Sequence, residues 1–431
     1  MILSSRARRV FAVTLCVGFT GCTQGGPAPV VPFAMRGFAV SRAQEMRSAA
    51  VSYKSLYSFG RKADDGDEPL ANLTVVGEKL YGTTEIGGET TQFCFLGCGS
   101  VFFVTTSGAQ SVTYRFKGGA DGALPAAGLL SLNGKLFGTT NGGGNAAACS
   151  GGCGTVFALG ADGKTEKILH RFTGGTDGAN PVAGLVALNG TLYGTTQYGG
   201  KRAQLCATGC GTIFSITPDG KERVIYRFGG GTDGAFPTAR LTTVAGALDG
   251  TTEFGGITTT LCAQGCGTLF RASPSGTKKT LHAFKYSTAS RDGAYPAAGI
   301  VAMGGKLYGT TLGGGEHGDG TVYAANESAN GERVIHSFSC CSSSVDGRYP
   351  LSHLSVLSGT LYGTTHLGGA KNLGAVFSVT PSGRERVLYS FLGKPDGEEP
   401  QAGLTMLNGF FYGTTSAGGV FSEGSIFKLS P

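Results

Sequence analysis

A short apolar motif, LYGTT or a close variant, recurs seven times along this chain of 431 residues. Successive copies are separated by intervals of 50 to 59 residues. Their glycines are Gly82, Gly138, Gly194, Gly250, Gly309, Gly363 and Gly413. An internal repeat of this period indicates that the chain packs copies of one supersecondary unit, so the length does not imply several domains.

Three further elements keep a fixed order around this motif. A glycine-led strand such as GTVF follows it, and a strand that ends in phenylalanine comes next. Asp-Gly, a proline and an apolar strand such as AGLVAL then lead into the next copy. The seven phenylalanines are Phe59, Phe116, Phe172, Phe228, Phe284, Phe338 and Phe391. Each unit is therefore predicted to contain four short strands, counted from AGLVAL as the first to the phenylalanine strand as the fourth.

Seven four-stranded units of about 50 residues are typical of a β-propeller. A β-solenoid is the alternative, but its coils use shorter repeats and its ends need caps. The chain begins on an isolated fourth strand (52–59) and ends on a unit with only its first three strands (401–430). We therefore predict an all-β fold, a seven-bladed β-propeller with four-stranded blades whose N-terminal strand completes the last blade.

The links between the strands predict two different faces. Asn-Gly pairs at 133–134, 189–190 and 408–409 join first to second strands, and this dipeptide is the signal for a type I′ hairpin. The links from third to fourth strand are also short, whereas those from second to third strand and from unit to unit are long. In a four-stranded meander the two long links emerge on the same side. Functional residues are expected on that loop face.

The N-terminal segment has the composition of an export signal. A basic start, MILSSRARR, precedes about a dozen apolar residues, too few to span a bilayer, and then Cys22. FTGC resembles the lipobox of bacterial lipoproteins, in which the cysteine is lipidated, although Phe19 replaces the usual leucine and ordinary cleavage is the alternative. We predict a signal peptide over 1–21, a lipid anchor at Cys22, a flexible linker over 22–50 and the propeller over 51–431.

The net charge of +7 gives no support for nucleic-acid binding. Residues 1–50 carry six arginines and one glutamate, so the remainder of the chain has a net charge of only +2 and no basic stripe. We expect no nucleic-acid partner and a monomer that meets the membrane only through its anchor. The location would be the outer membrane or cell surface, with the periplasm or the medium as alternatives.

The unit pattern resembles the choice-of-anchor GloVer tandem-repeat family of exported bacterial proteins. That family's unit reads approximately LYGTT, GG, GTVF, DG, F, DGA, P and GL, and the resemblance covers residues 52–430. It implies export and a variable anchor, and it implies little about activity because the family is defined by its repeat. Propellers of the NHL and kelch types are looser analogues, and a shared fold does not carry function.

Eight cysteines form four pairs, each four residues apart, in the loop between second and third strands of units one to four. They are Cys94/Cys98, Cys149/Cys153, Cys206/Cys210 and Cys262/Cys266. Zinc needs about four converging ligands, whereas these pairs lie on separate units without a histidine at ligand spacing. Each pair is predicted to form a local disulfide worth about 2 kcal/mol, with a redox role as the alternative. Cys340 and Cys341 are predicted to form a vicinal disulfide, with free thiols as the alternative.

Two recurrent polar positions are interpreted as structural. The Asp-Gly aspartates suit a turn, because aspartate accepts hydrogen bonds from its own backbone and no D-x-D-x-D calcium pattern accompanies it. These aspartates are Asp65, Asp121, Asp177, Asp233, Asp292, Asp346 and Asp396. His170, His282 and His336 align with tyrosines of other fourth strands, which indicates a packing position. The sequence therefore predicts no metal and no cofactor.

Three polar residues interrupt a column of glycines on the first strands. Gly128, Gly184, Gly299 and Gly403 occupy this column in four units, and the other three contain Asn72, Arg240 and His353. If the first strand is innermost, these side chains form a ligand-binding point at the channel mouth, with solvated channel residues as the alternative. The column after GTT also varies: it is Glu85, Asn141, Gln197, Glu253, Leu312, His366 and Ser416.

These observations favour a binding or interaction scaffold with an unknown protein or glycan ligand on the loop face. No unit departs sharply enough to mark a catalytic blade, so no catalytic residue is assigned. Aromatic residues in the loops are few (Phe93, Phe95, Tyr198 and Phe254), and without tryptophan a sugar-stacking platform has weak support. An extracellular polysaccharide lyase or hydrolase with its site at the channel mouth is the first alternative. A structural envelope protein is the second.

Overall fold

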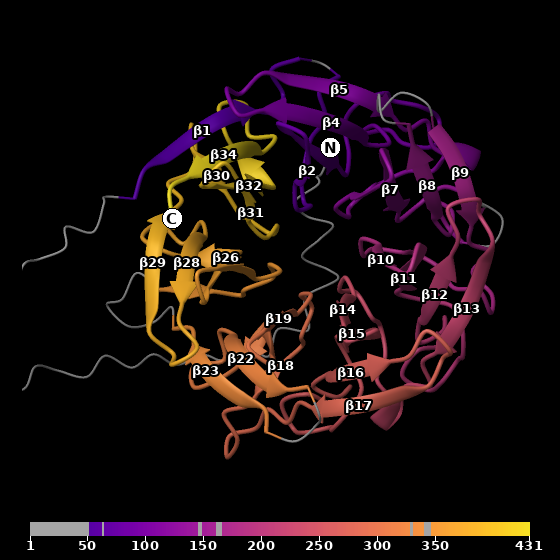
Figure 1. The fold of residues 1–431 in the computed structure, drawn as a ribbon, viewed down its shortest axis with the longest axis vertical. Coiled ribbons are helices and arrows are strands. Elements are labelled where there is room, and N and C mark those ends of the chain that lie inside the picture. Colours follow the sequence, from indigo (N-terminus) through magenta and orange to yellow (C-terminus); the bar gives the residue numbers. More distant parts are fainter. Residues whose placement is uncertain (1–50, 63, 145–148, 161–165, 328–330, 340–345) are drawn as a thin grey trace, which may run out of the picture. The chain divides into compact units, whose positions relative to one another are not determined.

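The computed structural model describes residues 51–431 apart from 63, 145–148, 161–165, 328–330 and 340–345. In this part of the chain, seven four-stranded antiparallel sheets stand in a ring around a central axis (Figure 1). Each sheet is one blade, and in six of the seven blades the strands run from the axis to the rim in chain order. The predicted all-β, seven-bladed propeller is confirmed.

The two inner strands of each blade have constant lengths. The first strands are β2 (Thr74–Val76), β6 (Leu130–Leu132), β10 (Val186–Leu188), β14 (Thr242–Val244), β19 (Val301–Met303), β25 (Ser355–Leu357) and β31 (Thr405–Leu407). The second strands are β3 (Lys79–Thr84), β7 (Lys135–Thr140), β11 (Thr191–Thr196), β15 (Ala247–Thr252), β20 (Lys306–Thr311), β26 (Thr360–Thr365) and β32 (Phe410–Thr415). The second strands contain the LYGTT motif and are almost completely buried.

The outer strands complete the blades. The third strands are β4 (Ser100–Thr105), β8 (Thr155–Leu159), β12 (Thr212–Ile216), β16 (Thr268–Ala272), β22 (Thr321–Asn326), β28 (Ala375–Val379) and β34 (Ser425–Leu429). The fourth strands are β5 (Gln110–Arg115), β9 (Glu166–Arg171), β13 (Glu222–Arg227), β17 (Lys278–Ala283), β23 (Arg333–Ser337), β29 (Glu385–Ser390) and β1 (Tyr53–Ser58). The fourth strands follow the rim of the ring, so each ends near the next blade (Figure 1).

The ring closes as the sequence predicts. The N-terminal strand β1 pairs antiparallel with the C-terminal strand β34, with Tyr53 opposite Leu429 and Ser58 opposite Ser425. The seventh blade therefore has the strand order β1-β34-β32-β31. Because the two ends of the propeller share one sheet, the first and last blades separate only if these backbone hydrogen bonds break.

The glycine of LYGTT makes room for an aromatic ring. A Cβ on Gly138 would lie 2.4 Å from Cζ of Phe157 on the neighbouring third strand. Phe157 is fully buried and packs edge-to-face against Phe116 of the preceding blade, with 5.1 Å between the ring centroids. All seven junctions repeat this aromatic pair at 5.1 to 5.3 Å. The motif thus places the hydrophobic core between blades.

The two threonines of the motif satisfy buried polar groups. In six of the seven units the first donates to the next blade, as Thr83 Oγ1 does to the carbonyl oxygen of Ala127 at 3.0 Å, and Thr195 is the exception. In six units the second pairs with a hydroxyl of its own third strand, as Thr84 Oγ1 does with Ser100 Oγ at 2.9 Å, whereas Thr365 lies opposite Ala375. Buried hydroxyls are costly unless they are hydrogen-bonded. LYGTT is therefore a structural motif of the blade junction.

The two faces differ as expected. Asn133, Asn189 and Asn408, at the tight turns between first and second strands, have φ of 50° to 51°, and the following glycines are also positive, as a type I′ turn requires. On the opposite face the loops pair with each other. Two-residue ladders form there between β18 (Gly293–Ala294) and β21 (Gly313–Gly314), β24 (Gly347–Arg348) and β27 (Leu367–Gly368), and β30 (Gly397–Glu398) and β33 (Ala417–Gly418). The 3-10 turns η1 (Gly119–Asp121) and η2 (Gly231–Asp233) also belong to unit-to-unit loops.

Candidate functional site at the channel mouth

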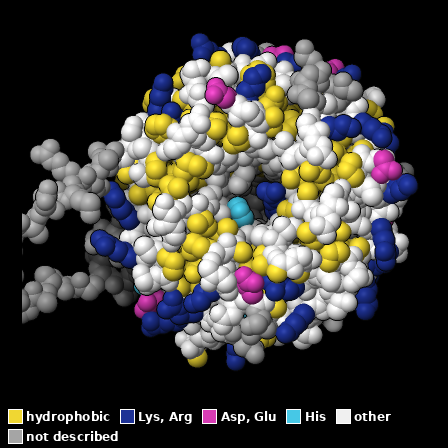
Figure 2. Space-filling view, viewed as in Figure 1, with side chains coloured by type: hydrophobic (Ala, Val, Ile, Leu, Met, Phe, Trp, Pro, Cys, Tyr) yellow, Lys and Arg dark blue, Asp and Glu magenta, His cyan; other side chains and the backbone are white. Residues whose placement is uncertain are grey.

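The interrupted glycine column forms a closed ring around the axis. Each position contacts the next one: a Cβ on Gly128 would lie 3.0 Å from the oxygen of Asn72, and one on Gly299 would lie 3.1 Å from the oxygen of Arg240. The space-filling view shows a hollow centre in which histidine and basic side chains are visible (Figure 2). Since four of the seven positions are glycine, the other three side chains dominate the wall of the channel at this level.

Arg240 supplies an unpaired positive charge to this ring. Its Nε donates to the carbonyl oxygen of Leu185 at 3.2 Å, and it forms no ion pair with any described residue. The side chain is open to the channel, yet the surrounding protein is close enough to lower the pKa of the guanidinium. The two terminal nitrogens therefore remain available to an anion, and arginine binds carboxylates with paired hydrogen bonds.

His353 is neutral in this environment. Burial, and then the charge of Arg240, lower the pKa of its imidazole to about 4. Its Nδ1 is buried against Gly299 without a well-formed hydrogen bond. A neutral imidazole beside an arginine offers one donor and one acceptor without adding a second charge.

Asn72 acts differently from the other two. Its Oδ1 accepts a hydrogen bond from the N–H of Gly403 at 2.8 Å, which joins the first blade to the seventh. The structure thus places Asn72, Arg240 and His353 on one ring. Asn72 and Arg240 are hydrogen-bonded to the backbone of a neighbouring blade, and no hydrogen bond joins any two of the three in the described part. An electrostatic contact links only Arg240 with His353.

The column after GTT sits at the loop ends of the second strands. In this column, burial raises the pKa of the Glu253 carboxyl to about 7. Its charge in turn raises the pKa of Tyr198 and Tyr295, after burial as the larger cause. Glu253 therefore interacts with tyrosines of both adjoining loops.

A row of aromatic side chains surrounds Glu253. Tyr198, Phe236, Phe254 and Tyr295 follow each other across blades three to five, with ring centroids 5.4 to 5.9 Å apart, and all four are half-buried. The sequence singled out Tyr198 and Phe254 but missed Phe236 and Tyr295, which precede prolines in the unit-to-unit loops. The row gives the loop face a continuous aromatic surface although the chain has no tryptophan.

The residue before each of the seven prolines has a left-handed backbone. These residues are Glu68, Leu124, Asn180, Phe236, Tyr295, Tyr349 and Glu399, with φ from 54° to 59°. Phe236 shows the reason: its N–H donates to the oxygen of Cys210 in the third blade, and its oxygen accepts from Glu253 in the fourth. Bulky residues in this conformation store about 1–3 kcal/mol of strain. This backbone conformation orients the aromatic side chains and the loops on the loop face.

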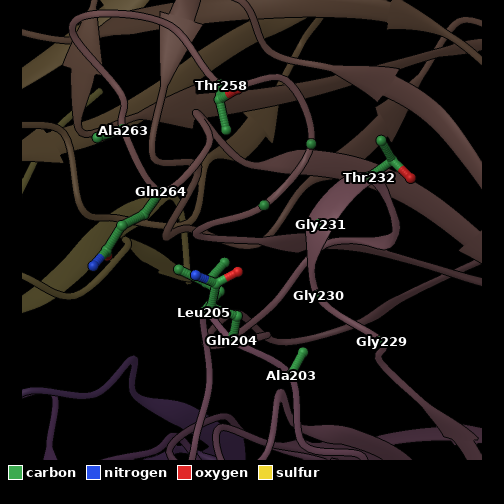
Figure 3. Close-up of a pocket in the computed structure, with 12 residues that line it drawn as sticks. Ala203, Gln204, Leu205, Gly229, Gly230, Gly231, Thr232, Thr258, Ala263 and Gln264 are labelled. Carbon is green, nitrogen blue, oxygen red and sulfur yellow. The ribbon is translucent and has the colours of Figure 1, made fainter.

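A groove lies on the loop face between the loops of blades three and four (Figure 3). Its volume is about 740 Å³, within the range of small-ligand sites. Its polar side chains are Gln204, Thr232, Thr258 and Gln264, the remaining lining is glycine backbone and small apolar residues, and no lining residue is charged. The groove adjoins the aromatic row, because Gly255 of its wall follows Phe254 directly.

The four loop pairs of cysteines are joined as disulfides: Cys94–Cys98, Cys149–Cys153, Cys206–Cys210 and Cys262–Cys266. The carbonyl oxygen of each second cysteine accepts a hydrogen bond from the loop that enters the next blade. Four disulfides fit an extracellular protein. Cys340 and Cys341 lie outside the described residues, as does Cys22. Within the described residues, no helix is long and apolar enough to cross a membrane.

The recurrent aspartates have the expected turn role. Asp233 illustrates it, because its Oδ2 accepts from the N–H of Gly229 at 2.7 Å. The three aligned histidines pack edge-to-face on the phenylalanines that end their strands, at 4.7 to 4.8 Å. Each aspartate also contacts the tyrosine or histidine of the preceding strand, which the sequence pattern did not indicate.

A family model of the Gloeobacter/Verrucomicrobia repeat matches residues 43–262 and 254–431. The chain belongs to this repeat family. The match confirms the resemblance to the GloVer family, and it extends over every blade of the ring. The LYGTT, GTVF and Asp-Gly positions of the Gloeobacter/Verrucomicrobia repeat are, in this chain, the residues that build the blade junctions.

Several solved structures resemble this Gloeobacter/Verrucomicrobia repeat protein, with low sequence identity. A chain of a nidogen–laminin complex is 18% identical (TM-score 0.39), with 62% of this chain and 79% of that chain covered. TolB from Acinetobacter baumannii is 14% identical (TM-score 0.37), with 67% of this chain and 59% of that chain covered. A gluconolactonase from Xanthomonas campestris is 15% identical (TM-score 0.36), with 64% of this chain and 78% of that chain covered. TM-scores below 0.5 carry no argument about function. No curated protein sequence matches the chain significantly.

Proposed function

We propose that this protein is an exported cell-surface binding scaffold that holds an acidic glycan on its loop face. The observation that carries the proposal is Arg240, whose guanidinium faces the channel mouth without an acidic partner among the described residues. An uncompensated guanidinium in a glycine-lined ring favours a ligand that brings its own negative charge.

Other features of the loop face favour a carbohydrate over a peptide. The half-buried row from Tyr198 to Tyr295 offers ring faces to the apolar faces of sugars. The neighbouring groove presents amides and hydroxyls, such as those of Gln204 and Thr258, without any charge. Neutral polar groups beside aromatic surfaces suit hydroxyl-rich ligands, and the carboxylate of a uronic acid would bind at Arg240.

Export and anchoring are part of this proposal. The signal-like segment over 1–21 and the four disulfides support an extracytoplasmic location. We propose that Cys22 is lipidated and that residues 22–50 form the tether. The propeller acts as a monomer, because its N-terminal strand closes the ring within one chain.

Calorimetric titration with matched acidic and neutral oligosaccharides tests the proposal. Arg240→Gly, which introduces the residue that four blades have at this position, should weaken the binding of uronic-acid oligosaccharides at least tenfold, since a charged hydrogen-bonding pair contributes about 1.5–3 kcal/mol. Arg223→Ala, at an exposed arginine on the fourth strand of blade three, is the control and should leave binding unchanged. Equal binding of neutral sugars, an unchanged Arg240→Gly variant or preferential binding of acidic peptides would refute the proposal.

One observation favours an enzyme as the second candidate. Glu253 has its pKa raised to about 7, which suits a group that gains and loses a proton near neutral pH. A polysaccharide lyase would use Glu253 as the base that removes the proton next to the carboxylate of a uronic acid. Incubation with acidic polysaccharides and detection of unsaturated products by ultraviolet absorbance distinguishes the two. Turnover that Glu253→Gln abolishes would establish the enzyme.

A further inference from the structure

The outer rim contains a repeated three-residue contact between successive blades. The fourth strand of one blade supplies a tyrosine or histidine, and the loop after it supplies the Asp-Gly aspartate. The residue four positions before the equivalent tyrosine or histidine of the next blade supplies the third side chain. At the junction of blades three and four these residues are Tyr226, Asp233 and Lys278. We call this arrangement the rim triad.

Lys278 shows that a rim triad accommodates a cation. Its side chain is only 2% exposed, and its Nζ lies 2.9 Å from Oδ1 of Asp233 and 2.6 Å from the Asp233 carbonyl oxygen. The aspartate is thus neutralised at this junction by a charge from the next blade. A buried carboxylate is stable when such a partner is present.

Four other rim triads have a glutamate in place of the lysine, and in two of them the glutamate, the aspartate and a histidine form a close cluster. Between blades four and five the triad is His282, Asp292 and Glu332, and between blades five and six it is His336, Asp346 and Glu385. In each triad, one imidazole nitrogen and two carboxylate oxygens lie within 4.8 Å of one another. The structure therefore brings two acids together where the neighbouring junction has an acid and a base.

The buried carboxylates of these triads have open coordination sites. The side chain of Glu332 is only 7% exposed, and its Oε1 has no hydrogen-bond partner among the described residues. Oε1 of Glu385 and Nε2 of His336 are likewise buried without a well-formed hydrogen bond. Leaving such atoms without a partner costs about 1–3 kcal/mol each, and more when the group is charged.

We propose that these two rim triads are binding sites for divalent transition-metal ions, with Zn²⁺ as the best fit. Nε2 of His282 lies 3.1 Å from Oδ2 of Asp292 and 3.8 Å from Oε2 of Glu332. When several ligand atoms each lie about 2.0–2.2 Å from one zinc ion, the distances between the ligand atoms are similar to the separations of these nitrogen and oxygen atoms. One imidazole and two carboxylates suit zinc, whereas calcium prefers oxygen ligands alone. Water would complete the coordination.

Such ions would join blade four to blade five and blade five to blade six. The first site links β17 and its following loop to blade five, and the second links β23 and its following loop to blade six. The loop disulfides occur only in blades one to four, because the corresponding loops of the other units contain no cysteine. The metal ions would therefore act as structural clamps, separate from the glycan site at the channel mouth.

Zinc titration of the purified full-length protein tests the proposal after removal of metal with a chelator. Mass spectrometry of bound metal and calorimetry with Zn²⁺ should give two ions per chain. Glu332→Lys and Glu385→Lys reproduce the arrangement of Lys278, so each should fold, lose one ion and retain the other. The double variant should bind none, and Zn²⁺ should no longer raise its thermal midpoint.

Glu222→Lys is the matched control. It changes the junction of blades two and three, which has the same residue types as the two proposed sites: His170, Asp177 and Glu222. The ligand atoms of these three residues do not form a cluster within 4.8 Å. This variant should still bind two ions. Absence of zinc binding by the wild type would show that the paired carboxylates share a proton instead, and would overturn the proposal. Unchanged stoichiometry in the double variant would overturn it as well.

Discussion

Replacing Gly138 by alanine tests whether the LYGTT glycine is required by the packing of blades. The new Cβ would lie 2.4 Å from Cζ of Phe157, 2.8 Å from its Cε1 and 2.9 Å from Cδ2 of Leu129. Real Cβ contacts are longer than these, so the ring would have to move. Phe157 cannot move freely, because it is fully buried and packs on Phe116 of the preceding blade.

The magnitude follows from two opposing effects. Overpacking of a well-packed core costs about 1–3 kcal/mol. Alanine at an extended position recovers about 0.5–1 kcal/mol, because it loses less backbone freedom on folding than glycine does. Gly138→Ala should therefore reduce the free energy of unfolding by about 1–2 kcal/mol. Urea unfolding followed by circular dichroism measures this change at equilibrium.

A double-mutant cycle identifies the cause. Phe157→Leu shortens the side chain that the new methyl group meets, so Gly138→Ala should cost less in that background, with a coupling energy of about 1 kcal/mol or more. Gly175→Ala is the control for backbone effects alone, since its φ is not in the left-handed region and its Cβ position meets only Thr173 Oγ1 at 3.5 Å. An equal cost of Gly138→Ala in both backgrounds would show that the ring contact is not the reason for the glycine.

Two further predictions concern buried polar groups. The pKa of His353, about 4, lies below its ordinary value of 6.5, so its stabilising contribution is complete above pH 6.5 and is lost as the pH falls towards 4. The free energy of unfolding of the wild type, relative to that of His353→Gly, should thus decline by about 3 kcal/mol from pH 7 to pH 4, at ~1.4 kcal/mol per pKa unit. A difference that does not change with pH would contradict the burial of a neutral imidazole. Tyr323→Phe should raise the free energy of unfolding by about 1–3 kcal/mol, because the tyrosine hydroxyl is buried without a partner among the described residues and phenylalanine occupies this position in the six other blades. Destabilisation by this change would reveal a hydrogen bond to that hydroxyl.

The candidate site was only partly predictable from the sequence. Arg240 and His353 were found because they interrupt a column of glycines, and the structure places that column around the axis. Phe236 and Tyr295 were missed because nothing in a residue before proline indicates a left-handed backbone that brings the side chain into the aromatic row. Their placement depends on hydrogen bonds to two blades at once.

The rim triads were missed for a related reason. Asp-Gly is a local turn signal, and the turn is present, but the second contact of Asp292 comes from Glu332 on the next blade. Glu332 lies 50 residues after His282 in the sequence and only 4 before His336. A local pattern therefore does not bring Glu332 together with His282, and from the sequence the aspartates are interpreted only as turn residues.

The sequence by itself determined the architecture, because it is repeated seven times. The recurrence of four strands, the orphan strand at 52–59, the Asn-Gly turns and the paired cysteines are each readable within one unit, since strand patterns and tight turns depend on neighbouring residues. The tertiary structure decided which blade partner each polar side chain meets. Outer strands that run along the rim carry one blade's glutamate or lysine to the previous blade's aspartate, and closure of the ring brings Arg240 and His353 to one channel. These contacts join residues that are about one blade or more apart in the chain, so they are visible only in the folded ring.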